Sequence, residues 1–172
     1  MNNDWIKPYL SIRKDFPKPG VSFHWYGKLL RDPQAFRQVI QTFADRYRDQ
    51  KIDVILTIEA RGFIFGSALA YELYLPLVLV RKCGRLPEET HFKHFELEYG
   101  ADCLEVEKQA LQPGQRVLIL DDLLATGGSA EAASQLAKHA EAEVIEVACL
   151  LEMTIFQGRY TLSAPFFSLF QV

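Results

Sequence analysis

Two kinds of hydrophobic pattern alternate along the chain. Short runs that are almost wholly apolar predict strands buried on both faces, and they cover residues 53–58, 76–81, 116–120 and 144–151. Between these runs we expect helices at residues 32–47, 62–74 and 128–139, the first from apolar residues at helical spacing and the last rich in alanine. Asp32 and Pro33 begin the first helix as an N-cap and a first-turn proline.

Buried strands that alternate with helices predict an α/β fold, in which helices flank both faces of a doubly wound, mainly parallel sheet. In such sheets, ligands bind beyond the carboxyl ends of the strands, so the residues after each strand are the first place to look for chemistry. Residues 82–102 interrupt the pattern with glycine, proline, charges and aromatic residues, and they predict a hairpin or a lid loop.

The composition limits the kind of protein. The 172 residues suit one domain, and 49% hydrophobic with 24% charged residues excludes a disordered chain. A net charge of −3 argues against a broad nucleic-acid surface but leaves room for a local basic pocket. The sequence has no apolar stretch long enough to span a bilayer and no signal-peptide core, so we expect a cytoplasmic protein without a membrane partner. Three cysteines, an odd number with no C-x-x-C pair, predict no disulfide framework.

The segment DDLLATGGS, which follows the apolar run 116–120, carries the clearest chemical signal. Carboxylates such as Asp121 and Asp122 repel phosphate but accept hydrogen bonds from hydroxyl groups. Main-chain N–H groups at a glycine-rich helix start bind phosphate. The segment therefore predicts a site for a phosphorylated sugar, in preference to a plain strand-to-helix turn. The phosphate would lie against Ala125, Thr126, Gly127, Gly128 and Ser129. The chain has neither a Walker A loop nor a G-x-G-x-x-G fingerprint.

Basic residues follow two other predicted strands. Arg61 comes after the run 53–58 and can hold an anion through paired donors. Arg81, Lys82 and Arg85 crowd together at the end of the run 76–81, where a pyrophosphate would explain them. The alternative is ordinary surface charge, with Arg61 bridged to a neighbouring glutamate and Arg85 paired in the same way.

Several motifs in the same order resemble one known family. DDLLATGGS is similar to the PRPP-binding motif of type I phosphoribosyltransferases, where PRPP is 5-phosphoribosyl-1-pyrophosphate. Four further motifs are similar to those of the adenine phosphoribosyltransferase branch: EARGFIFG, RKxGRLPxET, LEYGxDxLE and, near the C-terminus, Leu151-Glu152 followed by Gly158-Arg159. The resemblance spans nearly the whole chain, from about Phe16 to the C-terminus.

This resemblance implies purine salvage, in which adenine and PRPP give AMP and pyrophosphate. It implies a type I phosphoribosyltransferase fold in one domain over residues 1–172, with a hood at about 1–30 and a flexible lid at about 82–102. The implied catalytic residues are Glu98, Asp121, Asp122 and Arg61. The implied pyrophosphate-binding residues are Arg61, Arg81, Lys82 and Arg85.

The same resemblance implies the purine site, the lid and the partners. Val21, Phe23 and His24 would bind the purine, and Glu98 with Tyr99 would lie on the lid. Glu98 is the candidate for handling the purine N7 proton, with Asp121 or Asp122 as the alternative. Mg²⁺ would be held mainly by PRPP, pyrophosphate and water, with no direct protein ligand. We also expect a homodimer and no nucleic-acid partner.

The hood departs from the family pattern, because His24 and Trp25 stand where Arg and Asp are usual. Two alternatives therefore remain beside adenine: a phosphoribosyltransferase for another 6-substituted purine, and a non-catalytic PRPP- or nucleotide-sensing regulator on the same fold. A zinc site is a further hypothesis, since His91, His94 and the nearby Cys83 and Cys103 are all residue types that bind zinc. Their spacing, however, matches no familiar ligand pattern. We expect Cys83 to be either a reactive thiol beside cations or an inert loop residue.

Overall fold

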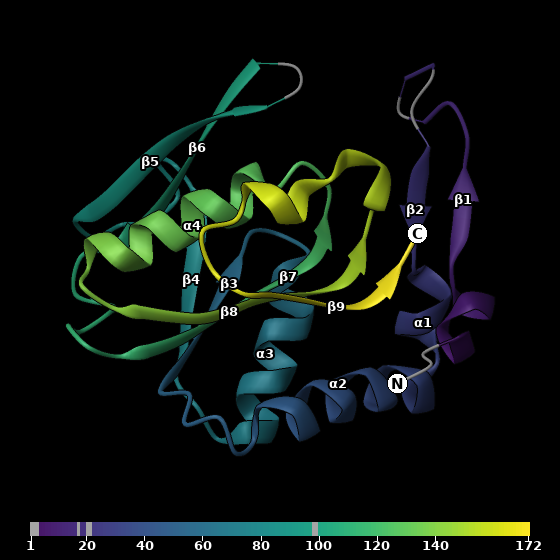
Figure 1. Cartoon of the computed structure of the whole chain (residues 1–172), viewed down its shortest axis with the longest axis horizontal. Coiled ribbons are helices and arrows are strands. Elements are labelled where there is room, and N and C mark those ends of the chain that lie inside the picture. The colour runs from purple at the N-terminus through teal and green to yellow at the C-terminus, as the bar shows by residue number, and fades with distance from the viewer. Residues whose placement is uncertain (1–3, 17, 20–21, 98–99) are drawn as a thin grey trace.

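A seven-stranded sheet forms the centre of the molecule and lies between two helical layers (Figure 1). The computed structural model describes residues 4–16, 18–19, 22–97 and 100–172. The strand order is β5-β6-β4-β3-β7-β8-β9. In this order the strands are Thr90–Leu97, Gly100–Glu107, Leu77–Lys82, Val54–Ile58, Arg116–Leu124, Glu143–Glu152 and Phe166–Gln171.

Strands β4, β3, β7, β8 and β9 are all parallel, so their carboxyl ends lie along one edge of the sheet. Strands β5 and β6 form an antiparallel hairpin, which joins the sheet where β6 pairs with β4. The fold is therefore the doubly wound, mainly parallel α/β fold that the sequence predicts. The region expected to be a hairpin or lid is largely this β5–β6 hairpin.

Helices cover both faces of the sheet, and the alternation of strand side chains explains how. On β3, Ile55 packs into the core shared with α2 (Pro33–Tyr47) and α3 (Gly62–Leu73). Its neighbours Val54 and Leu56 point to the opposite face and pack with α4 (Gly128–His139). Because both faces are covered, the central strands carry no polar face, which is why they are continuous apolar runs in the sequence.

Helix α2 begins at the predicted N-cap. The Asp32 carboxylate accepts hydrogen bonds from the main-chain N–H groups of Gln34 and Ala35 at 2.9 and 3.1 Å. Pro33 occupies the first turn, where its missing N–H costs nothing.

The N-terminal segment forms a separate small unit beside the C-terminal strand β9 (Figure 1). It contains the 3₁₀ helix η1 (Asp4–Tyr9), the antiparallel pair β1 (Ser11–Arg13) and β2 (Phe23–Trp25), and the short helix α1 (Gly27–Arg31). Two further 3₁₀ turns, η2 (Thr154–Phe156) and η3 (Gly158–Thr161), lie between β8 and β9. The part of the chain that the structure describes contains no helix long and apolar enough to cross a bilayer.

One expectation from the sequence is wrong. The odd number of cysteines argued against disulfides, but Cys83 and Cys103 form one, with Cα atoms 5.4 Å apart. The third cysteine, Cys149, is free and buried. The reason is strand register: Lys82 pairs with Leu104 across β4 and β6, so the next residue along the chain lies opposite Cys103. Cys83 is therefore neither a free reactive thiol nor an inert loop residue.

Candidate functional site

A cavity of about 260 Å³ opens at the carboxyl ends of β3 and β7. Two segments line it: residues 58–61, which turn from β3 into α3, and residues 121–130, which run from the end of β7 into α4. Both predicted aspartates, Arg61 and all five predicted phosphate-loop residues lie on this lining. The sheet topology thus gathers into one cavity the two segments that the sequence singled out separately.

The loop Ala125–Ser129 has the shape that a phosphate site needs. Gly127 adopts a φ of 87°, which L side chains rarely take, and it directly precedes the first turn of α4. A Cβ atom there would lie 2.6 Å from the Gly158 carbonyl oxygen, so only glycine fits. The first N–H groups of a helix have no intrahelical acceptor and favour an anion. Because they border the cavity, they are available to one.

Helix η3 supports this loop from outside the cavity. The Thr161 hydroxyl lies within hydrogen-bonding distance of the carbonyl oxygens of Thr126 and Gly158, at 3.0 and 2.8 Å. Glu152, at the end of β8, accepts hydrogen bonds from Arg159, Ser168 and Gln171 and so fixes the chain that leads into and out of η3. Sequence reasoning missed Thr161, because nothing in its local pattern marks a contact to residue 126.

Asp122 lies at the centre of a buried polar cluster. The residue is 4% exposed, and its Oδ2 lies 2.9 Å from Arg61 Nε. The Tyr26 hydroxyl donates a hydrogen bond of 2.8 Å to the same oxygen, and Tyr26 is 1% exposed. Burial, followed by the nearby Asp122 carboxylate, raises the pKa of Tyr26 above its ordinary value of 10.0. Tyr26 is therefore a neutral donor that holds the carboxylate in place, a role that the sequence did not reveal.

The surroundings of Asp121 disfavour its charged form. Its Oδ1 accepts a 2.7 Å hydrogen bond from the Asp122 main-chain N–H. Loss of hydration, together with the adjacent Asp122 charge, raises the pKa of Asp121 well above its ordinary value of 3.8. A carboxyl group whose pKa is raised in this way is suited to exchange a proton with a ligand.

The other predicted cations lie beside the cavity, and the side chains of Arg81 and Lys82 are already paired with carboxylates. Arg81 donates to the Glu59 carboxylate at 3.2 Å, and the Lys82 main-chain N–H donates to the same group at 3.0 Å. The Lys82 ammonium lies 2.9 Å from Asp102, and the Arg85 main-chain N–H donates to Glu105. Of this group only Glu59 lies on the cavity lining. The structure thus places Arg81, Lys82 and Arg85 near the site without bringing them into it.

The N-terminal unit brings an aromatic stack toward the same site. Phe23, Trp25 and Tyr26 stack on one another with ring centroids 5.6 to 6.2 Å apart. The Arg61 guanidinium lies 5.7 Å from the centre of the Phe23 ring, which links this stack to the cavity wall. The Nδ1 atom of the half-buried His24 has no hydrogen-bond partner among the residues that the structure describes. The other predicted residues of the purine site and lid, Val21, Glu98 and Tyr99, lie outside the described residues.

The structure does not bring the candidate zinc ligands together. Cys83 and Cys103 are joined to each other, and the His91 ring faces His139, with centroids 4.4 Å apart, rather than His94. Within the described ranges, no three His, Cys, Asp or Glu side chains converge as a metal site would require.

A cavity between parallel strand ends, with paired carboxylates on one side and a glycine-rich helix start on the other, defines a protein that binds sugar phosphates. A family model described as "Phosphoribosyl transferase domain" matches residues 26–163, so the chain belongs to the phosphoribosyltransferase family, with the type I fold.

Relatives place the chain within that family. The chain is 49% identical over 158 residues to an adenine phosphoribosyltransferase of Roseiflexus castenholzii, covering 91% of this chain and 92% of the relative. The crystal structure of adenine phosphoribosyltransferase from Thermoanaerobacter pseudethanolicus is 41% identical with a TM-score of 0.95, covering 99% of this chain and 100% of that one. The Saccharomyces cerevisiae enzyme, complexed with adenine and an imino-altritol bisphosphate, is 38% identical with a TM-score of 0.93, covering 97% of each chain. The present chain therefore belongs to the adenine phosphoribosyltransferase branch of the family.

Proposed function

We propose that the protein transfers the 5-phosphoribosyl group from PRPP to adenine, giving AMP and pyrophosphate. The observation that carries the proposal is the cavity itself, because one wall carries two carboxylates and the next carries bare helix-start amides. That pairing is complementary to a sugar phosphate, whose hydroxyl groups and phosphate need opposite partners. The family and its adenine-specific relatives supply the reaction.

The 5′-phosphate binds to the loop Ala125–Ser129. Main-chain N–H groups at the start of α4 donate to its oxygens, and the helix dipole favours its charge. The hydroxyl groups of Thr126 and Ser129 add donors. Support from Thr161 keeps the loop in its binding shape before the ligand arrives, so less ordering is needed on binding.

The two carboxylates act on the ribose. Asp122, oriented by its contacts with Arg61 and Tyr26, accepts hydrogen bonds from the ribose hydroxyl groups. Displacement at the anomeric carbon passes through an oxocarbenium-like state, which nearby negative charge stabilises. Asp121, with its raised pKa, is the described carboxyl group best suited to exchange a proton with the purine.

The pyrophosphate group leaves toward the cations at the end of β4. Arg81 and Lys82 hold carboxylates in this structure, so binding of PRPP exchanges those carboxylates for phosphate oxygens. Such partly exposed ion pairs cost little to break, which makes the exchange feasible. Arg85, whose charge acts on Glu59, joins them.

The purine lies against the aromatic stack. Phe23 offers a ring face for stacking, and the unpartnered Nδ1 of His24 offers one polar contact to the edge of the base. A buried polar atom without a partner is costly, so a ligand that satisfies it gains affinity.

Magnesium fits this donor set as a cation delivered with the substrate. Asp121 and Asp122 are hard oxygen ligands of the kind Mg²⁺ takes, but Asp122 already pairs with Arg61, so most ligands come from PRPP, pyrophosphate and water. When bound, Mg²⁺ neutralises charge on the pyrophosphate leaving group. Arg81, Lys82 and the end of β4 are the protein groups that face that leaving group.

A direct assay tests the proposal. Purified protein is incubated with PRPP and Mg²⁺ and with adenine, hypoxanthine, guanine or xanthine, and nucleotide formation is followed. We expect AMP from adenine and no product from the three oxopurines. Product from an oxopurine alone, or PRPP binding without any product, would contradict the proposal. We further propose a homodimer, and light scattering that finds the mass of a single chain at assay concentration would contradict that.

A further inference from the structure

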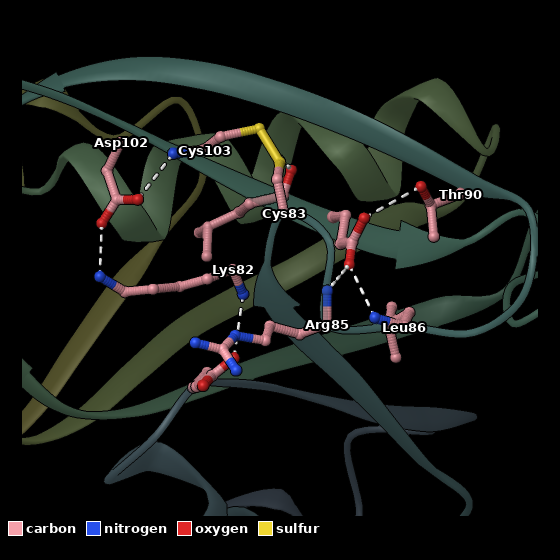
Figure 2. Close-up of a disulfide and its surroundings, with 10 residues drawn as sticks. Lys82, Cys83, Arg85, Leu86, Thr90, Asp102 and Cys103 are labelled. Atoms are coloured by element: carbon pink, nitrogen blue, oxygen red, sulfur yellow. Dashed lines mark hydrogen bonds and ion pairs between the residues drawn. A yellow bond between two sulfur atoms is a disulfide. The ribbon is translucent and has the colours of Figure 1, made fainter.

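One covalent bond joins the end of β4 to the hairpin strand β6. Cys83 directly follows β4 and forms the disulfide with Cys103 of β6, as Figure 2 shows. The main-chain N–H of Cys83 also donates to the carbonyl oxygen of Cys103 at 3.1 Å. The ladder that joins β4 to β6 is short, with Arg81 opposite Glu105 and Lys82 opposite Leu104. The disulfide therefore adds a covalent link to a connection that otherwise consists of this ladder and of side-chain packing, such as that of Leu104 with Val80 in the core.

The residues beside the two cysteines form an ion pair. Lys82 precedes Cys83, Asp102 precedes Cys103, and the Lys82 ammonium lies 2.9 Å from the Asp102 carboxylate (Figure 2). A covalent link one residue away keeps this carboxylate at high effective concentration near the ammonium group. The disulfide thus favours the state in which Lys82 is occupied by a protein carboxylate.

A second set of contacts holds the same region without the disulfide. The buried Glu105 carboxylate accepts hydrogen bonds from the main-chain N–H groups of Arg85 and Leu86 at 2.7 and 2.8 Å. It also accepts one from the Thr90 hydroxyl at 3.1 Å. Because these bonds and the strand ladder do not depend on sulfur, the base of the hairpin stays folded when the disulfide is broken.

We propose that Cys83–Cys103 is a redox modification site that controls how readily Lys82 engages the pyrophosphate group of the substrate. The reductant is a dithiol. Its thiolate attacks the sulfur of Cys83, the more exposed of the two residues, and the Cys103 thiolate leaves and takes a proton. The second thiol of the reductant then closes its own disulfide and releases Cys83 as a thiol. Two electrons and two protons pass to the protein sulfurs, and the dithiol becomes a disulfide.

The two states differ in their affinity for PRPP. In the oxidised state Lys82 must leave Asp102 against the constraint of the disulfide. In the reduced state the covalent constraint beside Asp102 is gone, and the Lys82 ammonium group exchanges this carboxylate for phosphate oxygens more readily. The gain is that of one partly exposed ion pair, so reduction lowers the KM for PRPP by about two- to fivefold. This effect rests on the proposed function, because Lys82 matters only if pyrophosphate leaves at this end of β4.

The test compares oxidised and dithiothreitol-reduced protein, with the state of the bond checked by peptide mass mapping. The KM for PRPP is measured in both states for the unmodified protein and for two variants. Cys103→Ser cannot form the bond, so it should show the low KM with or without dithiothreitol. It also retains Cys149, so any effect of the reductant on that thiol would still be seen. Asp102→Asn keeps the disulfide but removes the competing charge, so its KM should be low and should not respond to reduction.

The possible outcomes distinguish a failure of the proposed redox site from a failure of the proposed enzyme activity. If neither state forms AMP, the proposed function is wrong. If AMP forms with one KM for PRPP in both states, or if mapping of air-oxidised protein finds Cys83 and Cys103 as free thiols, the redox site is wrong. A KM that still responds to reduction in Asp102→Asn overturns the role of the ion pair. Thermal melts of both variants confirm that each is folded at the assay temperature.

Discussion

The hydrogen bond between Tyr26 and Asp122 offers a sharp test of the site, because it joins the N-terminal unit to the sugar-binding carboxylate. Tyr26→Phe removes one oxygen atom and keeps the ring. The ring packs edge-on against Phe65 at 5.5 Å and stacks on Trp25 at 5.6 Å, so its packing should survive. What is lost is one buried 2.8 Å hydrogen bond to a charged group.

The magnitude follows from burial. A hydrogen bond to a charged group contributes about 1.5–3 kcal/mol to stability. For a chain of this size, 1 kcal/mol shifts the Tm by about 2–4 °C, so the Tm should fall by about 3–12 °C. Asp122 keeps Arg61 as a partner but loses its second fixed contact, so its orientation toward the ribose loosens. If about half of the lost energy, about 0.75–1.5 kcal/mol, is missing from the transition state, kcat/KM for PRPP falls by about four- to twelvefold.

The assay combines a thermal melt with initial rates of AMP formation at varied PRPP and saturating adenine. Tyr9→Phe is a matched control, because the Tyr9 hydroxyl also donates to an aspartate, Asp32, at 2.9 Å, but at the start of α2. We expect the control to leave kcat/KM unchanged. A Tyr26→Phe protein with the normal kcat/KM and a lowered Tm would show that the hydroxyl only stabilises the fold. Normal values of both would refute the reasoning.

Three further predictions address the rest of the site. Asp122→Asn and Arg61→Ala should each lower kcat/KM by at least about tenfold while circular dichroism shows a folded protein, and normal rates in either would remove that residue's role. Gly127→Ala should weaken PRPP binding in calorimetry, since a Cβ would lie 2.6 Å from the Gly158 carbonyl oxygen at a strained φ, and normal binding would contradict the assigned loop geometry. Hydrogen bonds from Arg159 and other groups lower the pKa of Glu152 below 4.5, so its contribution to stability is present above that pH and is lost as the pH falls through the folded-state value. Thermal melts should therefore show a smaller loss of Tm below pH 4.5 in Glu152→Gln than in the unmodified protein.

Much of the fold is predictable from the sequence because the central strands are buried on both faces. A strand such as Val54–Ile58 is buried at every position, so all its side chains but Thr57 are apolar, and that pattern is unlike a loop or a surface helix. The Thr57 hydroxyl is satisfied by donating to the Leu120 carbonyl oxygen at 3.0 Å. The edge strand Phe166–Gln171 was not assigned from sequence, because its side chains are only partly buried apart from Leu169 and its place depends on pairing with β8. The edge strand β5 lacks a continuous apolar run for the same reason, whereas in β6 the buried Glu105 interrupts the apolar pair Leu104 and Val106.

The contacts that could not be predicted from the sequence are those between residues far apart along the chain. Tyr26 and Asp122 are 96 residues apart, and no local pattern links them. The odd number of cysteines argues against disulfides, but the bond between Cys83 and Cys103 depends on the register between β4 and β6, which the count does not reveal. In both cases the chemistry of each residue was visible, whereas its partner was fixed only by the three-dimensional arrangement of the strands.

The cations of the site separate by how tightly their carboxylates are buried. Arg81 and Lys82 pair with groups that water still reaches, so exchange of those carboxylates for pyrophosphate oxygens is inexpensive. Arg61 pairs with Asp122, which is 4% exposed, and removing the guanidinium from a buried carboxylate costs several kcal/mol. Arg61 should therefore stay on Asp122 throughout turnover and meet the substrate only with its remaining N–H groups. It follows that Arg61→Lys, which keeps the charge but loses the planar fork, should impair the reaction more than Arg81→Lys, and equal losses in the two variants would contradict this division of roles.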